Sequence, residues 1–191
     1  MGNREDLLAG AKKCLYEKGY ARTTARDIVA ASGVGLASIG YHFGSKEALL
    51  SEAVMEAFEE WGDELRELLA DTTRAEPASL DAAWERVSGF FVSHRPLLLA
   101  GIEAFAQANR VPGLREQLAE AYERARMNLA LPLRPETAGA SDEKAERAVG
   151  SFHLAVISGL GLQWLLDPEG SPSGAELAQA MRLFVKAADA G

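Results

Sequence analysis

The segment TARDIVAASGVGLASIGYHFGSKEALL, residues 24–50, decides how the N-terminal part of the chain folds. Thr24 with an acidic residue three positions later is typical of a capped helix start, and Gly33 is typical of a helix end, so a short helix is predicted between them. A second short helix is expected over residues 36–43, which the following glycine ends. Two short helices joined by a glycine-containing turn form a helix-turn-helix, whose second helix enters the major groove of DNA.

Apolar side chains of this segment are expected to be buried, and its polar side chains to face outward. Ile28, Val34 and Ile39 recur at spacings that would bury them between the two short helices and the helix before them. The remaining side chains include hydroxyls, an imidazole and cations, which are groups that hydrogen-bond phosphate oxygens. The predicted DNA-binding residues are Thr24, Arg26, Gly35, Leu36, Ala37, Ser38, Gly40, Tyr41, His42 and Lys46.

Three runs within the segment resemble the DNA-binding head of the TetR family of bacterial transcriptional regulators. They are TARDI at 24–28, GV at 33–34 and SIGYHFGSKEALL at 38–50. The resemblance covers residues 1–50 in detail, and the rest of the chain is similar to the family in length and helical content. It implies a homodimer that binds a palindromic double-stranded DNA operator, with a helical body that pairs the subunits and holds a small-molecule inducer. Repression is the mode of action that the family implies.

The second helix departs from the family pattern at three positions. Gly35, Ala37 and Gly40 stand where the family often has serine, a small glycine and tyrosine. A glycine inside a helix weakens it by up to about 1 kcal/mol relative to alanine. Base contacts then fall to the neighbouring side chains, and the apolar Leu36 and Ala37 favour thymine methyl groups.

The composition of the 191 residues predicts an all-α protein. Apolar residues make up 48% and charged residues 25%, as in ordinary globular domains. Ala and Leu together number 59, against 18 for Val, Ile and Thr, which favours helices over strands. The net charge of −8 is uneven, because residues 1–47 carry +2 and residues 48–191 carry −10. The N-terminal part is therefore better suited to meet an anion.

The apolar pattern predicts about nine helices in two functional parts. Residues 1–47 are expected to form a helix-turn-helix DNA-binding domain, and residues 48–191 a ligand-binding and dimerisation domain. Residues 71–79 lose the apolar period and are expected to form a loop. A long helix is expected to start near Ser141 and to end at Leu166.

Several classes of protein are not expected. The single cysteine, Cys14, cannot pair within the chain, and three separate histidines form no recognisable metal-ligand cluster, so no metal or cofactor is predicted. The N-terminus lacks the pattern of a signal peptide, which predicts a cytoplasmic protein. The longest apolar run, residues 154–166, is shorter than the roughly 20 residues that cross a bilayer, so no membrane partner is expected.

An enzyme is not expected either. The chain has no convincing nucleophile beside a base, carboxylate pair or phosphate-binding glycine loop. The alternative that stays open is an all-α small-molecule carrier or enzyme without a role on DNA. Sequence-selective, salt-dependent binding to duplex DNA separates the two hypotheses.

The long helix before Leu166 is apolar nearly all round. One stripe contains Phe152 and Val156, and another contains Leu154 and Ile157. A helix of this kind must be covered on both sides, which predicts a two-fold four-helix interface made by the last two helices; a large monomeric core is the alternative. The predicted interface residues are Phe152, Val156, Gly159, Leu160, Gln163, Leu177, Met181 and Phe184.

Aromatic residues gather in the middle of the chain among few polar groups. Such a composition describes a ligand cavity and equally an ordinary core. If there is a cavity, an apolar or aromatic ligand fits it, with Asn109 or Arg126 as the orienting group. The predicted ligand-binding residues are Trp61, Trp84, Phe91, Phe105, Asn109, Tyr122 and Arg126.

Overall fold

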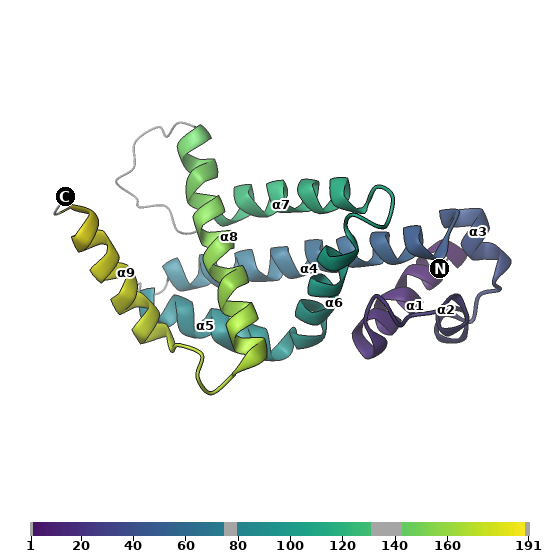
Figure 1. The fold of residues 1–191 in the computed structure, drawn as a ribbon, viewed down its shortest axis with the longest axis horizontal. Coiled ribbons are helices and arrows are strands. Elements are labelled where there is room, and N and C mark those ends of the chain that lie inside the picture. The colour runs from purple at the N-terminus through teal and green to yellow at the C-terminus, as the bar shows by residue number, and fades with distance from the viewer. Residues whose placement is uncertain (1, 75–79, 131–142, 190–191) are drawn as a thin grey trace. The chain divides into compact units, whose positions relative to one another are not determined.

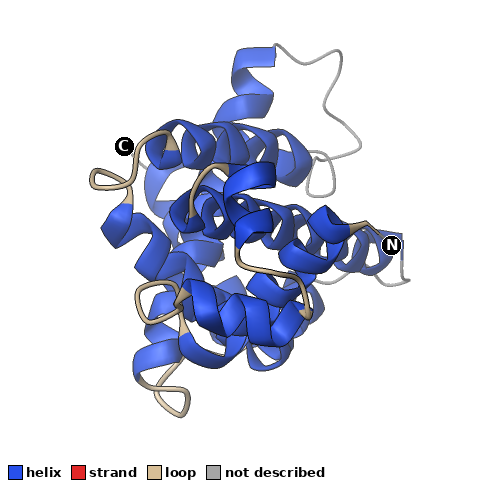
Figure 2. Ribbon diagram, turned by 90° about the vertical axis from the view of Figure 1, so that its right-hand side faces the viewer, coloured by secondary structure: helices blue, strands red, loops and turns tan. Residues whose placement is uncertain are grey.

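The computed structural model of the chain describes residues 2–74, 80–130 and 143–189. These residues form helices joined by turns and loops, and no strand occurs among them (Figure 2), which confirms the all-α prediction. The helices of the described residues, labelled in Figure 1, are α1 (Asn3–Lys18), α2 (Ala25–Ser32), α3 (Ala37–Phe43), α4 (Lys46–Arg74), α5 (Leu80–Ser93), α6 (Arg95–Gln107), α7 (Leu114–Ala130), α8 (Glu143–Leu166) and α9 (Gly174–Asp189).

Packing divides the chain into two compact units. The first unit comprises residues 1–61 and 95–123, so it holds α1 to α3, the first part of α4, α6 and the first part of α7. The second unit comprises residues 62–94 and 124–191, so it holds the rest of α4 and α7 together with α5, α8 and α9. The predicted boundary between residues 47 and 48 separates DNA binding from ligand binding and dimerisation, and it stays a prediction.

In the first unit, α1 and the first part of α4 lie side by side and run in the same direction. Arg4 pairs with Glu52, and Lys12 pairs with Glu56 at 3.2 Å and with Glu60 at 2.7 Å, so the ion pairs ascend together along both helices. An apolar seam lies beside these pairs. Its buried side chains are Leu7, Leu8, Ala11, Leu15, Leu49, Leu50, Ala53 and Val54.

Helix α4 is longer than expected. It continues to Arg74, so residues 71–74, expected to belong to a loop, are helical. That expectation was wrong because an apolar period marks the contact of a helix with a core, whereas the backbone hydrogen bonds continue beyond that contact. The rest of the expected loop, residues 75–79, and the expected start of α8 near Ser141 lie outside the described residues.

In the second unit, α9 packs along α5, and α8 also contacts α5. Two glycines permit close helix contacts there. A Cβ on Gly174, the first residue of α9, would overlap the carbonyl oxygen of Asp81 in the first turn of α5. A Cβ on Gly150 would overlap the carbonyl oxygen of Arg126, where α8 meets α7. A larger residue at either position would push the helices apart.

Helix α8 is long and apolar enough to cross a membrane by length and composition alone, with a mean hydropathy of 1.4 over an 18-residue window. This differs from the expectation, which counted only the 13 residues 154–166, whereas the 18-residue window also includes flanking residues of the helix. One face of α8 is nevertheless buried inside the second unit, through His153, Leu154, Ile157 and Leu160. A buried face of this kind is what a core helix of a globular domain has.

Candidate nucleic-acid interface

The start of α2 is held by a reciprocal capping box. The Thr24 hydroxyl oxygen accepts a hydrogen bond from the Asp27 backbone N–H at 3.2 Å, and the Asp27 carboxylate accepts one from the Thr24 backbone N–H at 2.8 Å. The Lys18 ammonium pairs with the same carboxylate. This ammonium, followed by the Thr24 hydrogen bonds, holds the pKa of Asp27 well below its usual range. The predicted cap is therefore confirmed, and its acid stays ionised.

The turn between α2 and α3 has the conformation that its glycine predicts. Gly33 has φ +71° in the left-handed region and donates its backbone N–H to the Val29 carbonyl at 2.9 Å. Ile28, Val34 and Ile39 are all buried, as expected for the apolar contacts of a helix-turn-helix. The two short helices are thus locked to α1 by packing, and α3 is presented as a fixed surface.

Helix α3 exposes one face to solvent. Ala37, Gly40 and Tyr41 are exposed, and their i, i+3 and i+4 spacing places them on one side of the helix. Tyr41 is 85% exposed, and Leu36, just before the helix, is 56% exposed. Large apolar and aromatic side chains left in solvent at adjacent positions indicate a surface that binds a partner.

The other predicted DNA-binding residues differ in exposure. Thr24, Arg26 and Gly35 are exposed, whereas Ser38, His42 and Lys46 are half-buried. The Lys46 ammonium donates a hydrogen bond to the Thr23 carbonyl at 3.1 Å and lies 3.3 Å from a Glu47 carboxylate oxygen. It therefore ties the start of α4 to the turn before α2.

Thr23 is a structural residue that the sequence reasoning missed. Its side chain is 1% exposed, and its hydroxyl donates to the Gly19 carbonyl at 2.7 Å. The neighbouring capping signal at Thr24 hid it, because both threonines precede the same helix. A second threonine four residues after Gly19, which ends the preceding helix, was the available clue.

The predicted ligand-binding residues are distributed over both units. Trp61, Phe105, Asn109 and Tyr122 belong to the first, and the Phe105 and Tyr122 rings meet edge to face with centroids 5.3 Å apart. Phe105 is 44% exposed, and Asn109 is exposed in the turn after α6.

The other three ligand-binding candidates, Trp84, Phe91 and Arg126, belong to the second unit. Trp84 and Phe91 are buried, and Arg126 is half-buried. The Phe91 ring lies 6.3 Å from that of Trp164, an aromatic neighbour absent from the prediction. The buried indole Nε1 of Trp84 has no hydrogen-bond acceptor among the residues that the structure describes. The described part of the second unit therefore contains neighbouring aromatic rings and one indole N–H without an acceptor.

The predicted interface residues differ in exposure. On α8, Phe152 is 48% exposed and Gln163 is exposed, while Leu160 lies in the core of the second unit. On α9, Phe184 is 73% exposed. The residues Val156, Gly159, Leu177 and Met181 are half-buried. The two stripes of α8 thus have different surroundings within the subunit, which the sequence alone left open.

Metal binding has no support in the described part of the chain, where no group of three or more His, Cys, Asp or Glu side chains is arranged to hold an ion. His153, the buried histidine, has a hydrogen bond between its Nδ1 and the Leu129 carbonyl at 3.1 Å. Burial lowers the pKa of this imidazole, so it is neutral at pH 7. It serves the packing of α8 against α7.

Two family models match the chain. One, described as bacterial regulatory proteins of the tetR family, matches residues 7–53. The other, described as the C-terminal part of BetI-type transcriptional repressors, matches residues 92–189, about half of the chain.

Known proteins are similar to the chain either over a short segment or over almost its whole length. The transcriptional repressor AcnR of Corynebacterium efficiens is 39% identical over 49 residues, 26% of each chain, so the chain aligns with about a quarter of that relative's length. A solved transcriptional regulator from Streptomyces coelicolor A3(2) is 28% identical with a TM-score of 0.64, and the match covers 93% of this chain and 95% of that one. A regulator from Saccharomonospora viridis, solved in complex with choline, has 22% identity and a TM-score of 0.65 over 96% and 95% of the chains.

Proposed function

Because the chain belongs to the TetR family of bacterial regulatory proteins, we propose that it is a transcriptional repressor that binds a palindromic DNA operator as a homodimer and is released by a small, largely apolar ligand. The observation that carries the proposal is the exposed face of α3, where Tyr41 extends into solvent close to the exposed Leu36, while the buried Ile39 packs the helix against α1. Such a protein acts in the cytoplasm, where operator DNA is found.

The exposed residues of the interface have separate tasks on DNA. Tyr41 and Leu36 would enter the major groove and contact base edges, with the Leu36 side chain suited to a thymine methyl group. The exposed Arg26 and Thr24 side chains would face phosphates on the groove edge, which set position but not sequence. Lys46 would act by holding the turn through its hydrogen bond to the Thr23 carbonyl. It would have a second role if a DNA phosphate replaced that carbonyl as the acceptor.

Dimerisation is proposed through α8 and α9. On α8, Phe152 is exposed while Ile157 on the other stripe is buried, and Phe184 on α9 is exposed. A Cβ at Gly159 would meet nothing within 4 Å, so this position leaves room for a partner helix. A two-fold contact of these faces would bury the apolar surface that one subunit leaves uncovered.

The ligand is proposed to bind among the aromatic side chains of the second unit. Trp84 and Phe91 would supply apolar walls, and the unused Trp84 indole N–H would donate to an acceptor on the ligand. Choline is the first compound to test, because the similar regulator from Saccharomonospora viridis binds it. Ligand binding would favour a spacing of the two heads that no longer fits successive major grooves about 34–36 Å apart.

The experiment is a selection of bound duplexes from a random DNA pool, followed by affinity measurements on the selected duplex at two salt concentrations. A two-fold symmetric consensus, a steep salt dependence and a loss of binding in Tyr41→Ala support the repressor. Weak binding without a consensus overturns it and favours the carrier or enzyme. Light scattering of wild type and Phe184→Glu tests the dimer, which the added charge should dissociate.

A further inference from the structure

Arg4, in the first turn of α1, joins three elements of the first unit. Its guanidinium carbon lies over the ring of Phe43, 5.2 Å from the ring centroid. One of its terminal nitrogens pairs with the carboxylate of Glu52 on α4. The guanidinium thus touches α4 and the last residue of α3 at once.

Helix α3 needs such support. It has seven residues, with Gly40 in its middle, and a helix this short has little stability of its own. Its last residue, Phe43, is partly buried against the apolar core of the unit, and Gly44, with φ +78°, turns the chain at once toward α4. The position of the Phe43 ring therefore determines how the end of α3 is placed.

We propose that Arg4 is a positioning residue for the recognition helix. The Glu52 carboxylate holds the guanidinium in place, and the guanidinium fixes the Phe43 ring. The position of this ring in turn sets the direction of α3 relative to the following helix α4. The planar guanidinium suits both contacts, because it stacks on an aromatic face while donating to a carboxylate. The inference rests on the proposed function, since correct placement of α3 acts on operator recognition.

Two other roles for Arg4 make different predictions. A direct phosphate contact would strengthen binding to every DNA sequence, and Glu52 would oppose it by neutralising the cation. A purely structural role would change the fraction of folded protein and so alter binding to every sequence equally. Positioning of α3 alone acts on the specific complex and leaves non-specific binding unchanged.

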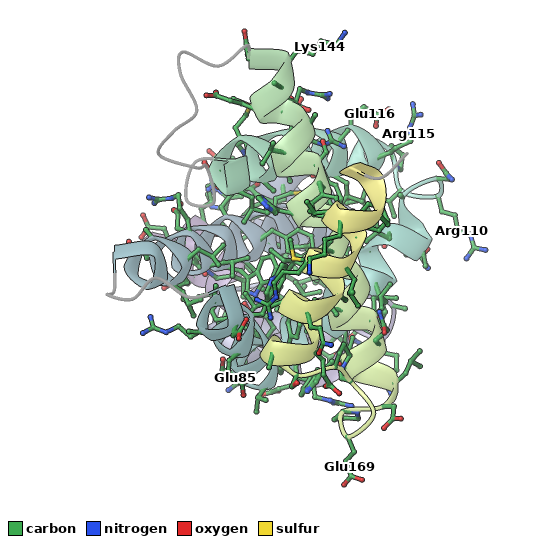
Figure 3. The ribbon with its side chains drawn as sticks, turned by 90° about the vertical axis from the view of Figure 1, so that its left-hand side faces the viewer. Glu85, Arg110, Arg115, Glu116, Lys144 and Glu169 are labelled. Atoms are coloured by element: carbon green, nitrogen blue, oxygen red, sulfur yellow. The ribbon has the colours of Figure 1, made fainter. Side chains whose placement is uncertain are left out.

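The test compares affinities for the selected operator and for an unrelated duplex of equal length. The variants are Arg4→Gln, Arg4→Lys and Glu52→Gln in the full chain. The control is Arg115→Gln, because Arg115 projects into solvent at the start of α7 (Figure 3) in an exposed ion pair with Glu116 at 3.2 Å. It removes the same charge from the same unit, far along the sequence from the helix-turn-helix.

All three variants at Arg4 and Glu52 are expected to bind the operator about three- to tenfold more weakly. Their affinities for the unrelated duplex should stay within about twofold of wild type, as should both affinities of the control. Glu52→Gln is decisive, because it removes a negative charge yet should weaken operator binding. Tighter operator binding by this variant, an equal loss on both duplexes, or wild-type specificity in Arg4→Lys each overturns the positioning role.

Hydrogen exchange of the free protein tests the same contact without DNA. The amides of α3 should exchange faster in Arg4→Gln and Glu52→Gln than in Arg115→Gln, while those of α2 stay unchanged. Unaltered exchange in α3 contradicts the positioning role. If wild type selects no operator but α3 exchange responds as expected, the repressor function fails and the placement of α3 by Arg4 stands.

Discussion

Glu103 on α6 accepts a hydrogen bond from the backbone N–H of Ala21 at 3.0 Å, across 82 positions of sequence. Its two carboxylate oxygens also lie 2.6 Å from the point that a Cβ on Gly19 would occupy. Gly19 has φ +83°, so only glycine satisfies both the backbone conformation and the space beside the carboxylate. One acidic side chain of α6 thereby holds the turn that leads from α1 into the helix-turn-helix.

Replacing Glu103 by alanine should loosen this turn. The variant loses the carboxylate that accepts from the Ala21 N–H, and the free energy of unfolding should fall by about 1 kcal/mol. Glu103→Gln keeps an acceptor oxygen and should lose less. Urea denaturation followed by circular dichroism measures both, with Glu120→Gln on the exposed side of α7 as the control. Equal stabilities of the alanine variant and the control would contradict the assigned contact.

The same substitution at two glycines should have opposite effects. A Cβ on Gly10 of α1 would lie 2.8 Å from the Ser32 Cβ and 3.0 Å from the Ser32 N, whereas a Cβ on Gly40 would meet nothing within 4 Å. Gly10→Ala should therefore destabilise the protein by about 1–3 kcal/mol. Gly40→Ala should stabilise it by up to about 1 kcal/mol, because alanine favours the helix.

Denaturant midpoints of the two alanine variants, measured side by side, check this pair. Gly40→Ala serves as the control for the helix-propensity gain that Gly10→Ala shares. If Gly10→Ala is as stable as Gly40→Ala, then α1 and α2 do not cross at the distance described. Gly40→Ala also tests whether the glycine in α3 serves DNA recognition. If it does, the operator affinity of this variant should fall although its stability rises.

His153 should make stability depend on pH in the neutral to mildly acidic range. Burial lowers the pKa of its imidazole in the folded state. Near pH 6.5 the unfolded chain therefore binds a proton at this imidazole that the folded chain does not bind. Stability from this group is fully present above the unfolded pKa and is lost as pH falls toward the folded pKa. His153→Asn places an amide nitrogen where Nδ1 now meets the Leu129 carbonyl, and it cannot titrate.

Thermal unfolding of wild type and His153→Asn between pH 8 and pH 5 gives the measurement. The difference in Tm between the two proteins should change as pH falls, in the direction that disfavours wild type. Subtracting the variant removes the pH-dependent contributions that both proteins share. Parallel curves would mean that His153 is accessible to protons in the folded state.

Local signals made the helix-turn-helix predictable. Thr24 with Asp27 and the glycines at 33 and 44 act through backbone hydrogen bonds and φ angles within a few residues, so a linear pattern contains them. Their apolar partners follow from helical spacing, and Ile28 and Ile39 are buried as expected. The fold of this region therefore follows from interactions between residues that are close in the sequence.

Long-range contacts were not predictable from one sequence. Arg4 and Glu52 are 48 positions apart, and Glu103 is 82 positions from Ala21, so neither pair has a periodic signature. For α8, two apolar stripes were equivalent in the sequence, and only packing against other helices buries the one that contains Ile157. The grouping of α6 with α1 has the same origin, because it depends on tertiary contact.

Cys14 should report the opening of the first unit. Its side chain is 3% exposed, and burial, together with the nearby Asp27 carboxylate, holds the pKa of its thiol above its usual value. A thiol of this kind reacts slowly, because the thiolate is the nucleophile and the reagent must reach it. Labelling by an aromatic disulfide reagent should therefore proceed through transient opening of the structure.

Gly10→Ala gives this prediction its quantitative form. If labelling requires opening of the α1 packing, each 1.4 kcal/mol that the variant loses should accelerate labelling of Cys14 by about tenfold. Phe184→Glu, on the exposed face of α9 in the second unit, should leave the rate unchanged. Fast labelling of folded wild type, equal to that of the unfolded chain, would show instead that the thiol is accessible and reactive, as a redox sensor requires.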